Sequence, residues 1–543
     1  MIRFQRFVQI FCLFLFLALL TIASVSGISM SSLDLFLQMD PGLIFITAIS
    51  GRIILLSFIP AAIVMITGPF IGRVFCGYIC PMGTTLDGTD ALFDVKNKPY
   101  LFSKNLLNIK YIVLVFLMGS ALFGVSYVFF ASPLSLITRF YGLVLFPVIS
   151  FLSKEVLDLV RPLGDVLDIN SISFAQVRTI RFATQFFILF FFIAIFCMVK
   201  FSTRFWCRYL CPSGALLALA SKSPLIRRQV SDKCTQCGKC TRECPMSAIE
   251  IENPENAFHS ECIVCRTCEE ICPEKAVSFG LSKYNKDIPS NIFSPKRRQL
   301  ISTGLIGAGT AVMSLTGLNS LYGKPGEGQV GAKGLVRPPG AVAEMNFLSR
   351  CVRCGECMTA CPSNTLQPIW LTAGFPAMFS PAITPRRGFC DPQCHECANV
   401  CPTDAIRSIG KLDRIWAKTG TAQIIRGKCL AWEFEKSCMV CDEVCPYDAI
   451  KFLNEKGSKV PVPHVMENKC AGCGYCEHFC PVRNQAAIVV TPMDALRMNQ
   501  GKYETQARLQ GFKLQLRPSG QRADPMESSP EMYQGPAPGF DRE

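Results

Sequence analysis

The stretch CTQCGKCTRECP, residues 234–245, decides how this chain folds, because its cysteine spacing recurs along the sequence. Of the 30 cysteines, 24 fall into six groups of four, and each group ends in Cys-Pro. Four groups share the spacing C-x2-C-x2-C-x3-C-P: Cys234/Cys237/Cys240/Cys244, Cys262/Cys265/Cys268/Cys272, Cys351/Cys354/Cys357/Cys361 and Cys470/Cys473/Cys476/Cys480. Two groups have a longer first interval: Cys390/Cys394/Cys397/Cys401 and Cys429/Cys438/Cys441/Cys445.

This spacing is that of bacterial [4Fe–4S] ferredoxins, in which the fourth cysteine of a group binds the other cluster. Zinc sites use separated C-x2-C pairs or mixtures with histidine, and disulfide frameworks belong to small secreted domains. A haem attached at Cys390-x3-Cys394-His395 is disfavoured, because this motif is one residue longer than C-x-x-C-H. We therefore predict six [4Fe–4S] clusters, and a chain of clusters implies electron transfer.

Most of the Cys-Pro pairs are followed by two residues and then Ala-Ile or Ala-Val, as at Ala248-Ile249 and Ala449-Ile450. This pattern predicts a helical turn that leads into a short strand, as in the small α+β ferredoxin unit. The group that starts at Cys351 departs from it, since SNTLQP follows at residues 363–368. An inserted loop is expected there, and its partner group is left open.

Apolar runs predict a membrane unit in the first part of the chain. Half of the residues are hydrophobic, and runs at 7–25, 44–66, 111–130 and 182–199 are near the length that crosses a bilayer. Basic residues flank alternate ends of these runs, so both ends of the unit and its central loop are predicted to be cytoplasmic. Residues 132–175, like Asp34 and Asp40, are then expected on the periplasmic side. The same pattern accounts for the net charge of +14 without nucleic-acid binding.

The membrane unit contains an internal repeat, FCGYICPMG at 75–83 and WCRYLCPSG at 206–214. The C-x3-C spacing puts two thiols on one helix face, and the repeat brings Cys76, Cys80, Cys207 and Cys211 into consideration as one site. These cysteines bind a metal or cluster, act as redox thiols, or pack structurally. Asp87 and Asp90 follow the first motif as proton acceptors or as solvated carboxylates.

A pair of arginines, Arg297 and Arg298, precedes a mildly apolar stretch rich in Gly, Ser and Thr. This pattern favours a twin-arginine export signal that forms a fifth span; a linker or interfacial helix is the alternative. If the signal is used, the later cysteine groups are periplasmic. The Pro-, Gly- and charge-rich tail is predicted to be disordered.

The combination of four spans, two C-x3-C-P motifs and a following two-cluster module resembles the NapH-type membrane ferredoxins. The segments Arg337-Pro338-Pro339-Gly340-Ala341 and Cys351-Val352-Arg353-Cys354-Gly355, which follow the twin arginines, resemble NapG and the related MauM-like ferredoxins. The resemblance covers nearly the whole chain apart from its tail. It implies a NapH–NapG fusion that oxidises membrane quinol and passes electrons to a periplasmic cytochrome or terminal oxidoreductase, as in nitrate reductase systems.

The predicted architecture is a multidomain chain that joins an α-helical membrane bundle to α+β two-cluster ferredoxin modules. It lies in the bacterial inner membrane, with the first module cytoplasmic and the second part periplasmic. The expected divisions are a membrane domain at 1–228, a two-cluster module at 229–285, a twin-arginine segment and linker at 286–340, a four-cluster domain at 341–495 and a disordered tail at 496–543.

These residues bear on three functions. The first is an electron-transfer subunit of a quinol-linked respiratory chain, and the second is a maturation factor that supplies electrons to a periplasmic metalloenzyme. The third, a catalytic iron–sulfur enzyme, is disfavoured, because the sequence has no Walker motif and no clear dinucleotide fingerprint. No catalytic residue is assigned, and an electron-transfer subunit is preferred to a stand-alone enzyme.

Overall fold

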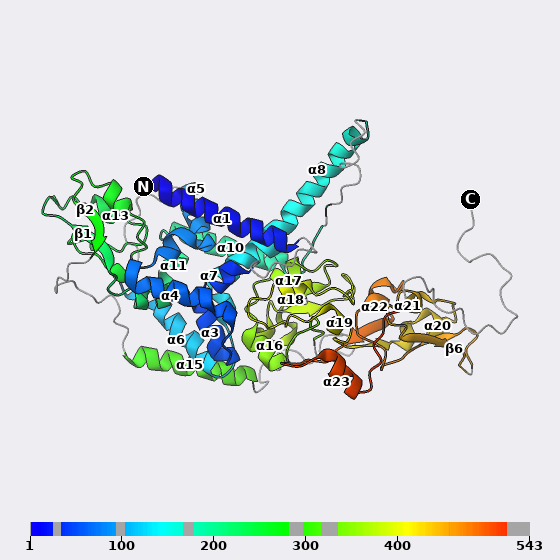
Figure 1. Cartoon of the computed structure of the whole chain (residues 1–543). Coiled ribbons are helices and arrows are strands. Elements are labelled where there is room, and N and C mark those ends of the chain that lie inside the picture. The colour runs from blue at the N-terminus through cyan, green and yellow to red at the C-terminus, as the bar shows by residue number, and fades with distance from the viewer. Residues whose placement is uncertain are drawn as a thin grey trace. The chain divides into compact units, whose positions relative to one another are not determined.

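The computed structural model describes residues 2–24, 34–93, 104–166, 177, 179–281, 297–315, 335–455 and 457–517. Its contacts divide the chain into two compact units (Figure 1). Unit 1 comprises Met1–Ile383, His395–Ile409 and Arg497–Gln500, and unit 2 comprises Thr384–Cys394, Gly410–Leu496 and Gly501–Glu543. The four-cluster domain expected at 341–495 is therefore shared between the two units.

The predicted spans correspond to helices of unequal length. Helix α1 (Ile2–Ser24) contains the one stretch in the described residues, Phe4–Ala23, that is long and apolar enough to cross a membrane. The second predicted span is interrupted, because helix α3 (Pro41–Gly51) ends at Arg52 in a left-handed conformation and α4 (Ile59–Ile71) starts anew. The last two predicted spans become α6 (Ile109–Leu122) and α10 (Gln185–Cys197), which are shorter than the roughly 20 residues of a full span. The expectation of four continuous spans is thus not met.

The expected periplasmic loop at 132–175 begins instead with a helix inside unit 1. Helix α7 (Pro133–Phe140) is almost wholly buried, and Ser132 caps it by accepting the Ser135 N–H at 3.3 Å. A wide turn, η5 (Tyr141–Leu145), then leads into α8 (Phe146–Val166). The remaining helical elements before the first cysteine group are α2 (Leu35–Gln38), η1 (Leu56–Phe58), η2 (Phe75–Ile79), α5 (Pro81–Leu92), η3 (Lys104–Asn108), η4 (Val128–Phe130), η6 (Met198–Lys200), α11 (Phe205–Tyr209) and α12 (Pro212–Ala220).

The twin-arginine segment forms a helix, α15 (Arg297–Leu315), that lies along α6 (Figure 1). Glycines allow the two backbones to approach closely: a Cβ atom at Gly119 would overlap the carbonyl oxygen of Gly304, and one at Gly307 would overlap that of Phe116. The hydroxyl groups of Tyr127 and Ser314 also form a hydrogen bond, at 2.5 Å.

Short strands and helical turns make up the cysteine-rich parts of unit 1. Strands β1 (Ile226–Val230) and β2 (Val277–Leu281) pair antiparallel, with α13 (Lys239–Arg242), η7 (His259–Glu261) and α14 (Thr267–Glu270) between them. The later part contains α16 (Glu344–Arg350), α17 (Glu356–Thr359), η9 (Leu371–Ala373), η10 (Phe375–Ala377), α18 (Glu396–Asn399) and the pair β3 (Leu366–Pro368) and β4 (Pro381–Ile383). The insertion expected after Cys361 is thus a small hairpin.

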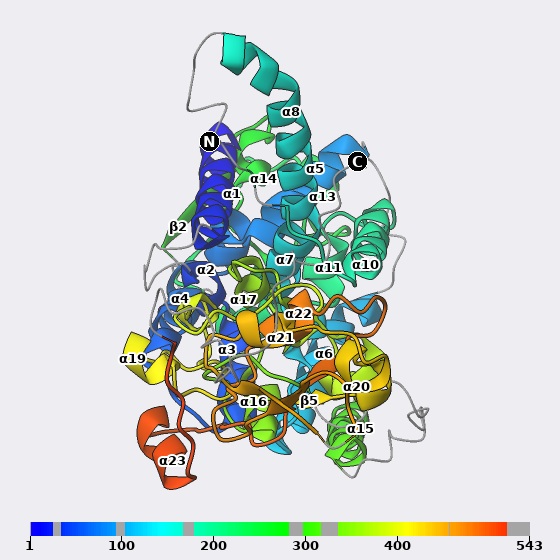
Figure 2. The ribbon, with the colours of Figure 1, turned by 90° about the vertical axis from the view of Figure 1, so that its right-hand side faces the viewer.

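Unit 2 is built in the same way from short elements. Strand β5 (Thr421–Ile424) pairs with β8 (Ile488–Thr491), and β6 (Ile450–Leu453) pairs with β7 (Val462–Val465). The helical elements are α19 (Lys411–Arg414), η11 (Arg426–Lys428), α20 (Leu430–Glu433), α21 (Val440–Glu443), α22 (Tyr475–Phe479) and α23 (Tyr503–Leu509); Figure 2 shows them in a second view.

The predicted disordered tail is wrong for its first part. Asp413 caps α23 by accepting the N–H groups of Tyr503 at 3.1 Å and Glu504 at 2.9 Å. Tyr503 and Ala507 are fully buried. Residues 518–543, also predicted to be disordered, lie outside the described residues.

The close approach of α15 to α6 predicts unequal effects of two substitutions on one helix. Gly307→Val is expected to lower the free energy of unfolding by about 1–3 kcal/mol, because its side chain would be forced against Phe116. Gly309→Val is the control, since no atom lies within 4 Å of its Cβ position. Thermal unfolding of the detergent-solubilised chain measures both, and equal midpoints would contradict this packing.

Candidate iron–sulfur cavities and the C-x3-C-P repeat

Five cavities in the described residues are each lined by four cysteines, and each joins two cysteine groups. Three cysteines come from the start of one group and the fourth comes from the end of another group, as the sequence predicts. In unit 1 these sets are Cys262/Cys265/Cys268 with Cys244, Cys234/Cys237/Cys240 with Cys272, and Cys351/Cys354/Cys357 with Cys401. In unit 2 they are Cys470/Cys473/Cys476 with Cys445, and Cys429/Cys438/Cys441 with Cys480.

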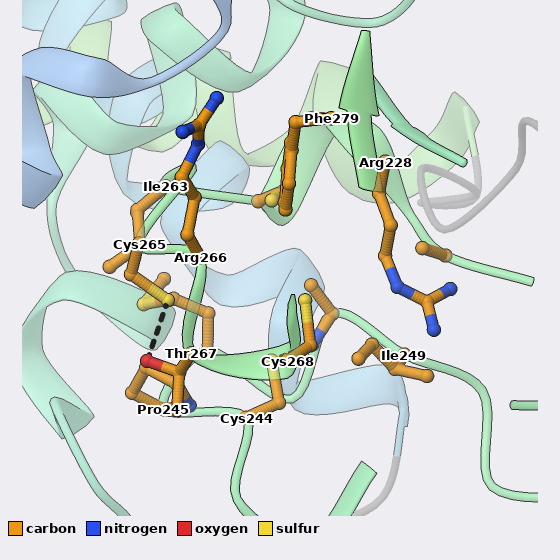
Figure 3. A pocket seen from close by; sticks show the side chains of 14 residues that line it. Arg228, Cys244, Pro245, Ile249, Ile263, Cys265, Arg266, Thr267, Cys268 and Phe279 are labelled. Carbon is orange, nitrogen blue, oxygen red and sulfur yellow. Dashed lines mark hydrogen bonds between the residues drawn. The ribbon is translucent and has the colours of Figure 1, made fainter. Parts of the chain in front are cut away.

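The first of these cavities, of about 400 Å³, illustrates the arrangement (Figure 3). Cys244, Cys265 and Cys268 surround it, with Arg228 and Phe279 from the two paired strands. The Thr267 hydroxyl lies 3.4 Å from the Cys265 sulfur and donates to it. The lining therefore supplies four sulfur ligands and almost no competing oxygen.

Left-handed residues shape the four cysteine loops of regular spacing. In the group at Cys262, the residues on both sides of the second cysteine, Val264 and Arg266, have φ of 57° and 61°. The equivalent residues are Gln236 and Gly238, Arg353 and Gly355, and Gly472 and Gly474. This repeated conformation curls the loop around the cavity, and it is favourable for glycine but unusual for the other side chains.

One predicted ligand, Cys237, differs from the others in its exposure. Its side chain is exposed to solvent, whereas the other three cysteines of the same cavity are partly buried. Solvent exposure is one of the determinants of cluster potential, so this cavity differs from its neighbours in that respect.

The Cys-Pro-x-x-Ala pattern has a structural role that sequence reasoning missed. The N–H of Ala248 donates to the Cys244 sulfur at 3.3 Å, and Ala276 and Ala449 donate likewise to Cys272 and Cys445. The residue before each alanine is left-handed, which turns the N–H toward the sulfur. Hydrogen bonds to cluster sulfurs are one of the determinants of reduction potential.

The donor set fits a cluster better than a single ion. No three His, Cys, Asp or Glu side chains in the described part of the chain converge closely enough to hold one metal ion. The thiols line cavities in sets of four instead. Each set would hold a [4Fe–4S] cluster, which supplies a one-electron carrier when bound.

The sixth set is divided between the two units. Cys361 and Cys397 belong to unit 1, and Cys390 and Cys394 belong to unit 2. Within unit 2, Arg414 donates to the Cys390 sulfur at 3.1 Å and to the Cys394 carbonyl oxygen at 2.8 Å. The sixth cluster stays a prediction.

Each C-x3-C-P motif is approached by the arginine that precedes the other motif. Arg73 and Arg204 each precede the first cysteine of a motif by three residues, a match that sequence reasoning overlooked. Arg204 donates to the carbonyl oxygen of Cys76 at 3.1 Å, so it reaches the other motif. Reciprocally, a Cβ atom at Gly214 would lie 2.9 Å from the Arg73 guanidinium. The final glycine of each motif leaves room for the arginine of the other.

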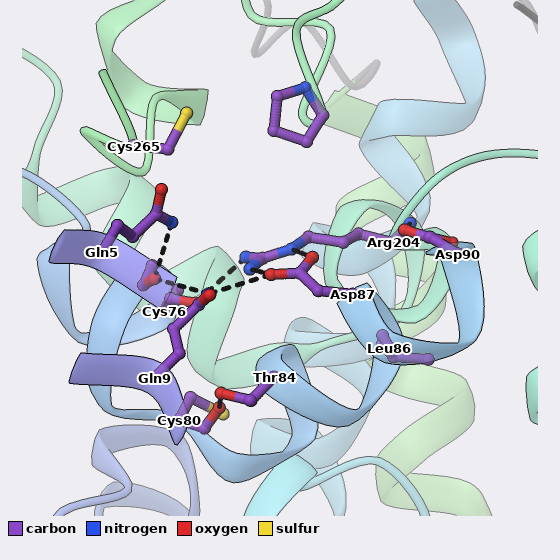
Figure 4. A network of polar contacts seen from close by, with 12 residues as sticks. Gln5, Gln9, Cys76, Cys80, Thr84, Leu86, Asp87, Asp90, Arg204 and Cys265 are labelled. Atoms are coloured by element: carbon purple, nitrogen blue, oxygen red, sulfur yellow. Dashed lines mark hydrogen bonds and ion pairs between the residues drawn. The ribbon is translucent and has the colours of Figure 1, made fainter. Parts of the chain in front are cut away.

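Carboxylates neutralise both arginines. Asp87 binds Arg204 through both oxygens and also accepts from Gln9 at 2.9 Å (Figure 4). Glu261 binds Arg73 at 2.9 Å and Lys110 beside it, and all three side chains are buried. Asp87 and Asp90 are therefore not freely solvated, since Asp90 accepts the Arg204 backbone N–H at 3.3 Å. Burial, with Asp87 nearby, raises the pKa of Asp90 to about 7.

Comparison with known proteins supports the iron–sulfur assignment. Models described as 4Fe-4S dicluster domains match residues 233–277 and 436–484, and models described as 4Fe-4S binding domains match 347–367 and, together, 53–98 and 184–231. Methylamine utilization ferredoxin-type protein MauM of Methylorubrum extorquens is 36% identical over 209 residues, which cover 37% of this chain and 91% of MauM. Ferredoxin-type protein NapG of Escherichia coli is 35% identical over 187 residues, 32% of this chain and 78% of NapG.

This chain belongs to the MauM and NapG ferredoxin-type family. A putative electron transport protein of Escherichia coli, YccM, is 28% identical over 225 residues, which cover 39% of this chain and 52% of YccM. The chain is thus a ferredoxin-type iron–sulfur protein of electron transfer, with several 4Fe-4S domains.

The four C-x3-C-P thiols gather in the interior of this ferredoxin-type chain. The Cys80 thiol interacts with Cys76 and Cys207, and the Cys211 thiol interacts with the same two. Burial raises the pKa of Cys80, Cys207 and Cys211, that of Cys207 to about 12. The repeat thus brings the four cysteines together, as expected; whether they hold a metal or cluster, act as redox thiols or only pack stays open.

Asp40, expected from the sequence on the periplasmic side, lies in the interior of unit 1. It is fully buried and accepts from the hydroxyls of Ser132, at 2.6 Å, and Ser213 in the second C-x3-C-P motif. It also accepts the N–H groups of Gly42 at 3.0 Å and Leu43 at 3.2 Å, at the start of α3. This carboxyl therefore ties α3, α7 and the second motif together.

The crossing of cysteine groups predicts which double substitutions affect a single cluster. Cys244→Ala with Cys265→Ala should remove the iron of one cluster, four atoms, because both line the same cavity. Cys240→Ala with Cys265→Ala is the matched comparison and should remove twice as much, because these residues line different cavities. Iron and sulfide analysis of the purified chain measures both; the same loss in the two variants would contradict the crossing.

The raised pKa of Asp90 predicts a pH-dependent stability. Between about pH 4 and pH 7 the folded chain holds a proton that the unfolded chain has released, so stability falls as pH rises through this window. Asp90→Asn should lack this contribution and gain relative to wild type as pH rises. Unfolding midpoints at about pH 5.5 and about pH 7.5 test it. Asp232→Asn, at an exposed site, is the control, and parallel curves for wild type and Asp90→Asn would refute the assignment.

Proposed function

We propose that this chain is a membrane-bound electron-transfer subunit that takes electrons from the quinol pool and passes them through [4Fe–4S] clusters to a periplasmic oxidoreductase. The observation that carries the proposal is that the helical part of unit 1, with the C-x3-C-P thiols inside it, contacts the loops of two separate cluster cavities. Clusters carry single electrons, and such a series of sites is what a quinol-linked electron route needs.

The first contact joins the first C-x3-C-P motif to the cavity of Cys244, Cys262, Cys265 and Cys268. A Cβ atom at Gly77 would overlap the Ile263 carbonyl oxygen, so this loop lies directly against the motif. The Tyr78 hydroxyl donates to the Val264 carbonyl oxygen at 3.1 Å. Cys76 itself packs against the small core that includes Ile263 and Cys265.

The second contact joins α7 and the following turn to the cavity of Cys351, Cys354, Cys357 and Cys401. The Ser135 hydroxyl donates to the Val352 carbonyl oxygen at 2.6 Å, and Arg139 donates to that of Arg353 at 3.0 Å. Leu143 packs where a side chain at Gly355 would be. Asp40 connects α7, through its cap Ser132, to the second C-x3-C-P motif.

The surface of the helical part supports a membrane location. Large apolar side chains are exposed on helices α1, α4, α10 and α15; examples are Phe7, Phe14, Ile63, Phe186, Phe190 and Leu305. Soluble monomers rarely expose apolar surface on this scale, whereas a lipid-facing bundle does. We propose a multi-pass inner-membrane unit in which α1 spans the bilayer and the shorter helices pack within it.

The NapH-like role of the first part and the export of the second part belong to this proposal. Arg297 and Arg298 stand exposed at the start of α15, which suits a recognised twin-arginine pair. The proposed acceptor is a periplasmic cytochrome or terminal oxidoreductase. The names of the relatives favour electron transfer but name no acceptor: NapG and MauM are called ferredoxin-type proteins and YccM a putative electron transport protein.

We propose that the C-x3-C-P thiols hold a further iron–sulfur cluster between the two cavities. Four thiols supply its ligands, and the 4Fe-4S model that matches 53–98 and 184–231 includes all four. The Arg204–Asp87 pair joins the two motifs, and the Arg73–Glu261 pair joins the first motif to the loop before Cys262. Redox-active thiols are the alternative that the following experiment separates.

Quinol-driven reduction in membranes tests the function. A reduced menaquinol analogue should reduce the clusters of the wild-type chain, followed by EPR, whereas Cys207→Ser should slow or abolish this reduction. Dithionite should still reduce the ferredoxin-type clusters of the variant. Cys197→Ser, an exposed cysteine outside the motifs, is the matched control and should behave as wild type. Failure of the analogue to reduce any cluster in wild type would refute the proposal, and a Cys207→Ser variant with full iron content would favour redox thiols.

A further inference from the structure

Two buried arginines beside one cluster cavity have no carboxylate partner in the described residues. Arg139 and Arg353 are each 2% exposed. Arg139 donates to the carbonyl oxygens of Arg353 at 3.0 Å and Phe129 at 3.1 Å and to the Ser135 hydroxyl at 3.4 Å. Arg353 donates only to backbone carbonyls, those of Ser126 at 2.8 Å, Leu348 at 3.4 Å and Pro376.

Three other arginines of unit 1, each at most 1% exposed, have a carboxylate partner. Arg73 binds Glu261, Arg204 binds Asp87, and Arg337 binds Glu344. Burying a cation without an opposite charge costs several kcal/mol, roughly, even when its hydrogen bonds are satisfied. Because no carboxylate pairs with Arg139 or Arg353 in the described residues, another anion is expected close to them.

The cysteines of the adjacent cavity are the anionic groups that face this pair. Arg353 lines the cavity of Cys351, Cys354, Cys357 and Cys401. Arg139 binds the carbonyl oxygen of Arg353, the residue that directly precedes Cys354, at 3.0 Å. Arg353 lies 4.1 Å and Arg139 5.8 Å from the centre of the Phe129 ring, and Arg139 lies 4.7 Å from that of Phe379.

Neighbouring carboxyl groups do not take this role. Glu344 interacts with Arg353 at longer range, but it is already bound by Arg337 and by Arg497 at 2.7 Å. Glu356 is buried in the same loop, and no ion pair joins it to Arg139 or Arg353 in the described residues.

We propose that Arg139 and Arg353 are the fixed counter-charge of a cluster held by Cys351, Cys354, Cys357 and Cys401, and that they raise its reduction potential. A cluster bound by four thiolates is anionic and gains one more negative charge when it is reduced. Positive charges in a water-poor environment stabilise the reduced form more than the oxidised form. The inference rests on the proposed cluster at this cavity and adds a direction: electrons are drawn toward it from sites of lower potential.

The first module offers an independent parallel. Arg228 lines both of its cavities and lies 3.6 Å from the Cys240 sulfur, and its other acceptors are the carbonyl oxygens of Pro254 and Glu255. An arginine bound by carbonyl oxygens, with no carboxylate partner in the described residues, thus lines cavities of the first module as well. The pair of arginines distinguishes the Cys351 cavity.

A merely structural role is the competing explanation, since both side chains bind loops through carbonyl oxygens. Substitutions that separate charge from bonding distinguish the two roles. Lysine keeps the charge of Arg139 or Arg353 and loses most of the hydrogen bonds, whereas glutamine loses the charge. Arg350 is the control, because it also directly precedes a cluster cysteine but is partly exposed to solvent.

The test is an EPR-monitored redox titration of the purified full-length chain after iron and sulfide analysis. Cys357→Ala identifies the signal of this cluster by its loss. Arg139→Gln and Arg353→Gln should each lower the midpoint of that signal by at least a tenfold change in the equilibrium constant, about 59 mV for one electron. The lysine variants and Arg350→Gln should shift it less, and the other signals should not move.

Two results would overturn the inference: an unchanged midpoint in Arg139→Gln with full iron content, or an equal shift in the lysine and glutamine variants. Arg139 lies outside the cysteine loops, so its variant keeps the test valid if Arg353→Gln does not assemble the cluster. If Cys357→Ala loses no iron, the proposed cluster itself is absent, and that failure is distinct from a potential that does not move.

Discussion

A cluster cavity in this chain closes only when cysteines from two groups meet. The last cysteine of one group completes the set begun by another, and the N–H of the alanine that follows donates to its sulfur. A single group therefore cannot form a site alone, and groups must fold as pairs. This constraint explains the interleaved division of the chain: His395–Ile409 belongs to unit 1 although unit 2 segments flank it, because Cys401 completes the cavity of Cys351, Cys354 and Cys357. An isolated antiparallel β-bridge between Ala341 and Ile406 also fixes the segment His395–Ile409 within unit 1.

Buried charge specifies the rest of unit 1. Buried ion pairs add little net stability, but losing one partner is costly, so they fix which elements meet. Arg73 and Arg204 each bind a carboxylate on a distant segment, Glu261 and Asp87, and each approaches the motif of the other. The Arg73 pair joins the helices to the loop before Cys262, so the first module has one orientation on the motif. Asp40 has the same effect with hydroxyl and amide donors.

The cysteine spacing was sufficient to predict that groups share their fourth ligand and that strands follow Cys272 and Cys445, because four ligands around one cluster leave few solutions. It left open which groups pair in the four-cluster part. It could not show that Cys237 faces solvent, since spacing carries no information on what packs over a loop. Nor could it reveal Arg73, Arg204 or Asp40, since a lone charged residue in a sequence does not show which distant motif it binds. Hydropathy located the apolar segments but not their breaks. The break at Arg52 depends on a left-handed residue after Gly51, and averaging over an apolar window hides it. The sequence also did not predict the ordered helix α23, because its cap, Asp413, lies 90 residues earlier in the chain.

The balance of charge differs between the two cavities that contact the helices. Near the first C-x3-C-P motif, Arg73 and Lys110 share Glu261, so much of their charge is cancelled before it reaches Cys262 and Cys265. At the second contact, Arg139 and Arg353 keep their full charge beside Cys351 and Cys354. Coulombic interactions weaken with distance but strengthen where water is excluded, so uncancelled charges close to a cluster have the greater effect. On the proposed route this asymmetry favours movement of electrons from the first module, or from quinol, toward the later cavities. The same fold with the carboxylates exchanged between the two contacts would favour the opposite direction, which places the control of direction in a few buried side chains and not in the cysteine spacing.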